Sequence, residues 1–303
     1  QSTPEGARDY LVPSRVHPGK FYSLPQSPQL YKQLLMVSGF DKYFQIAPCF
    51  RDEDARADRS PGEFYQLDME MAFASQEDVF SIVEQVLPPV FEKYGIYKEA
   101  SKAPFVRIPY LEAMDKYGSD KPDLRIDLVL TDATEVMQGC GFAPFEGQTV
   151  KAIVVDDFTA TRKQIDAICA EVEVQTARKG FWFRVDENGE FVGGISKFLQ
   201  DRKEEVIKAL GLKNGDFVGL AAGKKLEAQK TAGVYRKLLG AASEKHMKKD
   251  CYEFCWIVDF PMYEIGEESG ELEFCHNPFS MPQGGLEALN TMDPLDVLAY
   301  QYD

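Results

Sequence analysis

Alternating polar and apolar residues predict a β-hairpin between positions 44 and 73. The charged loop between its two strands ends in Ser-Pro-Gly at 60–62, which favours a turn. One face of the returning strand is apolar, and we expect it in the core. The other face is polar, and it is either a solvated sheet edge or the floor of a pocket. The apolar residues are Tyr65, Leu67, Met69, Met71 and Phe73, and the polar ones are Gln66, Asp68 and Glu70.

A helix is predicted over 29–37, with Ser27 as its N-cap and Pro28 at the first helical position. Two sets of side chains share this helix. Spacings of three and four place amides and a lysine on one face, which is either a solvated surface or part of a site. The apolar set is expected to be buried. The polar set is Gln29, Lys32 and Gln33, and the apolar set is Leu30, Leu34, Leu35 and Val37.

The remaining pattern mixes helices and strands, which predicts an α+β protein. Pro88-Pro89 is expected to kink or break the second long helix, and Asn188-Gly189 predicts a tight hairpin. Helices are predicted at 76–94, 110–117, 162–174 and 196–210, and strands at 10–12, 21–24, 105–108, 128–136, 149–155, 181–185, 190–192, 254–263 and 272–274.

Residues 118–123 form the best linker candidate, and the pattern of predicted strands, helices and turns changes after them. Segment 123–250 has enough strands, helices and turns to be an α+β domain of its own. The chain begins without Met and stops at Asp303 within an apparent element, so both ends are interpreted as cut.

Composition narrows the class of protein. A net charge of −15 argues against a general nucleic-acid binder, although a local basic groove can coexist with it. No apolar run is long enough to span a bilayer, and no leader opens the chain, so we expect a cytoplasmic protein. The six cysteines are dispersed without zinc-site spacing, which favours a reducing compartment and predicts no metal site.

Several common catalytic motifs are absent from the sequence. It contains neither a Walker phosphate loop nor a Gly-x-Ser-x-Gly elbow, and only three histidines. What it offers is Arg51 at a strand end, followed by acids and by a returning strand that carries Phe64.

This arrangement resembles motif 2 of the class II aminoacyl-tRNA synthetases, an aromatic-Arg-x-Glu followed by a loop and a Phe-bearing strand. Longer strings are similar, in the same order, to bacterial-type aspartyl-tRNA synthetases, and the resemblance covers essentially the whole chain. The strings lie at residues 4–10, 24–33, 50–59, 118–125, 258–262 and 276–279.

The resemblance implies an antiparallel sheet flanked by helices, with a catalytic domain at 1–122 and 251–303 interrupted by an inserted α+β domain at 123–250. It also implies an enzyme that joins L-aspartate to ATP and passes the aspartyl group to the 3′ end of tRNA(Asp). Arg51 would be the catalytic residue, gripping a phosphoryl oxygen and the attacking carboxylate together. The implied ATP-binding residues are Arg51, Asp52, Glu53 and Phe64.

The same resemblance assigns residues to aspartate. Lys32 would face the side-chain carboxylate, and His276 would close over it. The residues implied around the ammonium and α-carboxylate are Glu5, Ser27, Gln29 and Asp68.

Some parts of the family pattern are missing. Motif 1, motif 3 and the anticodon-reading domain are not found, so we expect the chain alone to be an inactive part of a homodimeric enzyme. Mg²⁺ is expected, with its main ligand beyond residue 303. Ser60-Pro61-Gly62 replaces a loop glutamine, and Asn277 stands where some members have a second histidine. Two alternatives stay open: an asparagine synthetase-like ligase that adenylates aspartate, and a non-catalytic synthetase paralogue that serves as an interaction module.

Overall fold

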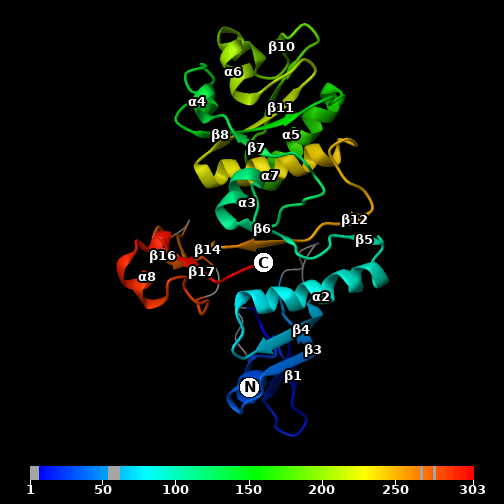
Figure 1. The fold of residues 1–303 in the computed structure, drawn as a ribbon, viewed down its shortest axis with the longest axis vertical. Helices are drawn as coiled ribbons and strands as arrows, with labels where there is room; N and C mark the ends of the chain where they lie inside the picture. Colours follow the sequence, from blue (N-terminus) through cyan, green and yellow to red (C-terminus); the bar gives the residue numbers. More distant parts are fainter. Residues whose placement is uncertain (1–6, 54–61, 267–268, 276–277) are drawn as a thin grey trace. The chain divides into compact units, whose positions relative to one another are not determined.

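The computed structural model describes residues 7–53, 62–266, 269–275 and 278–303, and the statements below concern these residues. The chain separates into two compact units, Gln1–Val83 and Glu84–Asp303. Helices and mainly antiparallel strands occur in both (Figure 1), which confirms the predicted α+β class. The predicted domain limits at 123 and 250 stay a prediction.

The first unit is built around the predicted hairpin. Its strands pair antiparallel over nine residues each, with Cys49 opposite Phe64 and Gln45 opposite Asp68. A smaller antiparallel pair and one helix complete the unit, and a second helix begins in it. The elements are β1 (Leu11–Pro13), β2 (Phe21–Ser23), α1 (Gln29–Val37), β3 (Lys42–Phe50), β4 (Glu63–Met71) and α2 (Gln76–Tyr94).

The alternation along β4 is confirmed, but the prediction that its apolar face is core is wrong for this structure. The exposed fractions are 67% for Tyr65, 49% for Leu67 and 36% for Met69. Phe44 and Ile46 extend the exposed apolar face across β3, because they pair with Met69 and Leu67. The period of two determines which residues share a face, but not which face is covered.

The predicted burial of α1 is also wrong. Lys32 is the buried residue of this helix, whereas Leu30, Leu34 and Val37 are 48, 57 and 87% exposed. Two carboxylates on β4 pair with the lysine, as described below, and this pairing holds the polar face of α1 against the hairpin. The predicted bounds of this helix, 29–37, are confirmed, but its N-cap is Pro28 rather than Ser27, and no side chain caps it.

The second helix continues through its two prolines. α2 runs over Gln76–Tyr94 with Pro88 and Pro89 inside it, so of the predicted kink or break the break is wrong, and the kink stays a prediction. Each proline removes one backbone donor, but the buried side chain of Phe80 anchors this helix. Packing of an amphipathic face commonly outweighs intrinsic propensity in this way.

The second unit contains a five-stranded antiparallel sheet in the order β10-β9-β11-β8-β7. Both faces are covered. α5 and α7 bury Ile165, Val172 and Tyr235 against one face, and α4 and α6 bury Met137 and Val206 against the other. The elements are β7 (Leu130–Asp132), α4 (Thr134–Met137), β8 (Thr149–Val155), α5 (Arg162–Thr176), β9 (Phe181–Val185), β10 (Phe191–Val192), α6 (Lys203–Leu210), β11 (Phe217–Gly223) and α7 (Lys225–Ala241).

Several sequence predictions for this sheet are confirmed and others are corrected. β8, β9 and the β9–β10 hairpin lie where expected. The predicted strand at 128–136 ends at Asp132, because Thr134 begins α4. The predicted helix at 196–210 is helical as α6 from Lys203 and as two 3₁₀ turns before it.

The other elements of the second unit are short. The predicted strand at 254–263 is divided where Asp259 adopts a φ of +57°, in the left-handed region. β5 (Glu99–Ala100) and β6 (Val106–Pro109) pair parallel with β12 (Cys251–Tyr252) and β13 (Cys255–Val258). The remaining elements are α3 (Tyr110–Tyr117), β14 (Phe260–Pro261), β15 (Tyr263–Ile265), β16 (Leu272–Phe274), α8 (Gly285–Thr291) and β17 (Leu298–Ala299).

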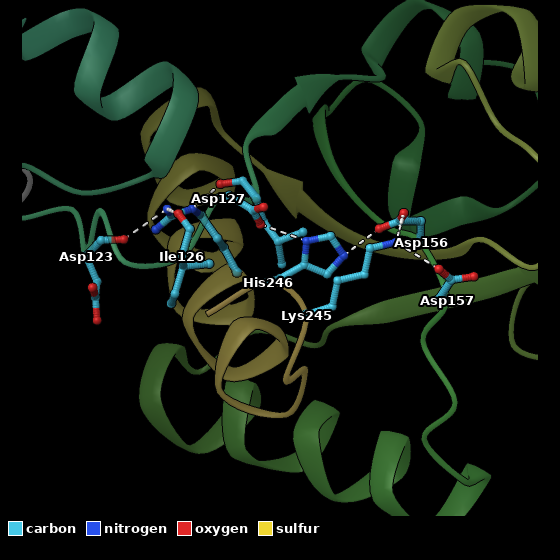
Figure 2. A network of polar contacts seen from close by, with 9 residues as sticks. Asp123, Ile126, Asp127, Asp156, Asp157, Lys245 and His246 are labelled. Carbon is cyan, nitrogen blue, oxygen red and sulfur yellow. Dashed lines mark hydrogen bonds and ion pairs between the residues drawn. The ribbon is translucent and has the colours of Figure 1, made fainter. Parts of the chain in front are cut away.

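A polar network joins the two segments that flank the five-stranded sheet (Figure 2). His246 Nδ1 lies 2.7 Å from Asp127 Oδ1, and its Nε2 lies 2.5 Å from Asp156 Oδ1. Lys245 pairs with Asp156 and with Asp157. Backbone hydrogen bonds run alongside, from the nitrogen of Asp127 to the carbonyl of His246 and from that of Lys248 to Arg125.

Candidate functional site

The candidate site lies on the polar face of the β3–β4 hairpin. The pairing register places Phe64, Gln66, Asp68 and Glu70 on the same face of β4, as the alternation predicted. At the rise of a β-strand, the four residue steps from Phe64 to Asp68 span about 13 Å. The face therefore presents an aromatic ring at one end and two carboxylates toward the other.

Lys32 is the centre of charge on this face. Lys32 is 7% exposed, and its Nζ lies 2.7 Å from Asp68 Oδ1 and 2.6 Å from Glu70 Oε1. Burial alone would lower the pKa of Lys32, but the hydrogen bonds and charges of the two carboxylates outweigh it and raise that pKa above its usual value. The lysine is therefore a fixed ammonium that reaches the face from α1.

Among the described residues, two buried acceptor atoms of the first unit have no hydrogen-bond donor. Asp68 Oδ2 and Gln26 Oε1 are both buried and unpaired. Gln26 is held by its amide nitrogen, which donates to the carbonyl of Ala7 at 3.0 Å and to Asp9 Oδ1. Buried acceptors without a donor are rare and costly in folded proteins. This pair points to a ligand that brings N–H donors.

Arg51 lies at the other end of the face. It follows the last residue of β3, and its Nε donates to the carbonyl of Gln26 at 3.3 Å. Its guanidinium lies over the Phe64 ring, 5.1 Å from the ring centre. The backbone also fixes it, since its N–H donates to the carbonyl of Gly62 at 2.8 Å. A planar cation and an aromatic ring are thus held together beside the loop.

A family model described as tRNA synthetases class II (D, K and N) matches residues 1–303. The chain belongs to this family. The predicted resemblance is therefore confirmed.

The curated relatives of this class II synthetase chain are named as aspartate–tRNA ligases or aspartate–tRNA(Asp/Asn) ligases. It is 54% identical over 305 residues to an aspartate–tRNA ligase of Streptomyces avermitilis and 53% identical over 304 residues to one of Streptomyces coelicolor. It is 54% identical over 318 residues to an aspartate–tRNA(Asp/Asn) ligase of Zymomonas mobilis. These matches cover 100% of this chain and 51, 51 and 52% of the relatives. The chain thus spans about half the length of the relatives it matches.

The class II synthetase chain brings part of the predicted residue set together. Lys32 and Asp68 are in contact, and so are Arg51 and Phe64. Ser27 is buried next to Gln26 in the sequence, and Gln29 is exposed at the start of α1, on the Lys32 side of the helix.

The other predicted residues are less tightly placed. Asp52 forms a β-bridge with Arg8 and an ion pair with it at 3.6 Å. Glu53 is exposed. Glu5 and His276 lie outside the described residues.

Three polar residues were not assigned to the site from the sequence. Gln26 can be identified only from the structure, in which it is 1% exposed. Gln66 and Glu70 could have been found, because the alternation of β4 places them on the Asp68 face. Gln66 Oε1 accepts a hydrogen bond from Cys49 Sγ at 3.2 Å, which fixes its orientation.

A metal site would require several His, Cys, Asp or Glu side chains close together. Within the part of the chain that the structure describes, no three His, Cys, Asp or Glu side chains are grouped so that they could hold a metal ion. These residues therefore do not fit a Mg²⁺ site by themselves.

Proposed function

We propose that this chain is the aspartate- and ATP-binding half of an aspartate–tRNA ligase. In the whole protein, the reaction would join L-aspartate to ATP, release pyrophosphate, and pass the aspartyl group to the 3′ end of tRNA(Asp). The observation that carries this proposal is the buried, unpaired Oδ2 of Asp68 beside the buried ammonium of Lys32. An acceptor and a cation side by side suit an amino acid that carries both an ammonium and a second carboxylate.

Each group on the face has a role in binding. The α-ammonium of aspartate would donate to Asp68 Oδ2 and to Gln26 Oε1, which lack donors. The side-chain carboxylate would accept from Lys32. The buried Ser27 and the exposed Gln29 lie in the segment that leads into α1, where they would contact the same ligand.

Arg51 and Phe64 would act on ATP. The adenine ring would stack on Phe64, and the Arg51 guanidinium would hold an α-phosphoryl oxygen together with the attacking carboxylate. The attack of the aspartate carboxylate on the α-phosphorus, with pyrophosphate as the leaving group, needs little covalent help but needs charge stabilised where it develops. A preorganised guanidinium provides that stabilisation. Asp52 and Glu53 would line the adenine side.

The remaining partners of the enzyme are proposed on the same basis. ATP is the expected co-substrate, the full-length protein is expected to be a homodimer, and the cytoplasm is its expected location. Among the described residues, no helix is long and apolar enough to cross a membrane. Because the described residues do not fit Mg²⁺ by themselves, no step is assigned to that ion here.

The test uses the full-length protein that contains this chain. It should catalyse aspartate-dependent ATP–pyrophosphate exchange and charge tRNA(Asp). Phe64→Leu should raise the KM for ATP about tenfold, because base stacking on an aromatic ring is worth about 1–3 kcal/mol and 1.4 kcal/mol is tenfold.

Tyr65→Leu is the matched control, since Tyr65 is the next residue of β4 and points to the opposite face. It should leave the KM for ATP unchanged. Exchange without tRNA charging would favour an amide ligase, and no exchange with aspartate would contradict the proposed function.

A further inference from the structure

Lys32 has two carboxylate partners on β4, and the proposed binding of aspartate uses one of them. Glu70 Oε1 is 2.6 Å from Lys32 Nζ, slightly closer than Asp68 Oδ1 at 2.7 Å. The two acids are two residues apart, so both side chains emerge from the same face of the strand. Their environments differ: the Asp68 side chain is 15% exposed and the Glu70 side chain is 36% exposed. Glu70 therefore approaches the lysine from the more open side.

The charges explain why one acid is not enough. If Lys32 were paired with Asp68 alone, its ammonium would compensate the carboxylate that must also receive the ammonium of the ligand. A second carboxylate holds the lysine by its other hydrogens, since an ammonium has three donors. Asp68 then keeps one oxygen free, and the structure shows that oxygen unpaired.

We propose that Glu70 is a positioning residue that sets specificity for an amino acid with a carboxylate side chain. It takes one of the ammonium hydrogens of Lys32, so that the lysine bonds only one oxygen of Asp68; the lysine then serves the side-chain carboxylate and the free Asp68 oxygen serves the α-ammonium. This inference rests on the proposed function. Glu70 touches neither substrate in this scheme and acts through Lys32.

An opposite effect of Glu70 is the alternative that an experiment must exclude. Lys32, Asp68 and Glu70 together carry one net negative charge, which repels a ligand carboxylate. If this repulsion dominated, neutralising Glu70 would strengthen aspartate binding. If positioning dominates, neutralising it weakens binding, because the ammonium then also turns toward Oδ2 of Asp68 and competes there with the ligand ammonium.

Glu70→Gln in the full-length protein separates the two effects, since glutamine keeps the shape and one acceptor oxygen but removes the charge. In ATP–pyrophosphate exchange, we expect the KM for aspartate to rise about tenfold while the KM for ATP stays within twofold. The unchanged KM for ATP shows that the variant is folded. Glu92→Gln, at an exposed position of α2, is the control and should change neither constant.

A pH profile provides a second readout that a purely structural role would not move. Lys32 keeps its proton with the help of both carboxylates. In Glu70→Gln, the KM for aspartate should therefore begin to rise at a lower pH than in the wild type.

The outcomes distinguish the two levels of the argument. An unchanged or lower KM for aspartate in Glu70→Gln, with active wild type, would overturn the role of Glu70 and leave the proposed function standing. Wild-type protein that fails to use aspartate would instead overturn the proposed function itself.

Discussion

Substituting Gly233 in α7 by alanine tests the packing of the second unit against a naive expectation. Alanine is favoured over glycine inside a helix by about 1 kcal/mol, so propensity alone predicts a more stable protein. The structure predicts the opposite. A Cβ at Gly233 would lie 2.4 Å from the carbonyl oxygen of Gly118 and 2.9 Å from that of Tyr117. Both atoms belong to backbone at the end of α3, which crosses α7 here.

The size of the stability loss depends on whether the contacted atoms can move away from the new Cβ. A contact of 2.4 Å is about 1 Å too short, and no side-chain rotation relieves it, because both partners are backbone. Gly118 cannot yield easily, since its φ is +67° and a Cβ of its own would meet the carbonyl of Gln229 at 2.2 Å. Overpacking costs about 1–3 kcal/mol. Taking the upper end and subtracting the helix gain leaves a net loss of about 2 kcal/mol.

Thermal and urea unfolding followed by circular dichroism would measure this loss. For a unit of this size, 2 kcal/mol corresponds to a fall in Tm of about 4–8 °C. Gly240→Ala on the same helix is the matched control, because its Cβ would meet side-chain atoms of Ile126, which can shift. We expect a smaller loss there. A Gly233→Ala protein as stable as the wild type, or more so, would refute the close backbone crossing.

Two further predictions concern ion pairs of the second unit. Lys151 is 2% exposed and pairs with Asp115 at 2.5 Å and with Asp132 at 3.2 Å. Lys151→Met should change the free energy of unfolding by less than about 1 kcal/mol. Replacing both aspartates by asparagine should lower it by about 2 kcal/mol, because the buried lysine then loses its partners. Urea titration of both variants checks this, and equal losses would contradict it. The hydrogen bonds from Arg125 hold the pKa of Asp123 below its usual range, so this carboxylate stabilises the fold above about pH 4 and the contribution is lost as pH falls through the lowered pKa. Asp123→Asn should therefore flatten the dependence of the urea midpoint on pH between about pH 2 and 5, and a slope identical to that of the wild type would count against the pair.

Much of the first unit was predictable from the sequence, because its signals are local. The hairpin follows from a period of two, and the polar set of β4 follows from the same alternation. What could not be predicted is the burial of Lys32. Its partner Asp68 is 36 residues away, and no local window shows that a lysine has an acid to pair with. The apolar residues of α1 therefore seemed the better candidates for the core.

The centre of the second unit was missed for a different reason. β11 is the middle strand of the five, and almost all of it is buried. Its sequence, Phe-Val-Gly-Leu-Ala-Ala-Gly, is rich in glycine and alanine, which have low strand propensity. The small residues are there for packing: a Cβ at Gly219 would lie 3.0 Å from the Tyr235 ring of α7. Because β11 needs small residues where α7 packs closely against it, it has few of the β-branched and aromatic residues by which strands are recognised in a sequence.

The β3–β4 hairpin shows how far a sequence pattern reaches into function. Alternation separates an apolar face from a polar one, and the family resemblance implies which ligands the polar face would bind. Neither says how the charges share their partners. That depends on distances of 2.6 and 2.7 Å from one ammonium to two carboxylates, and on the oxygen of Asp68 that has no donor among the described residues. The chemistry of the site lies in this unequal sharing, because a face with the same residues fully paired to one another would have nothing left to offer a substrate.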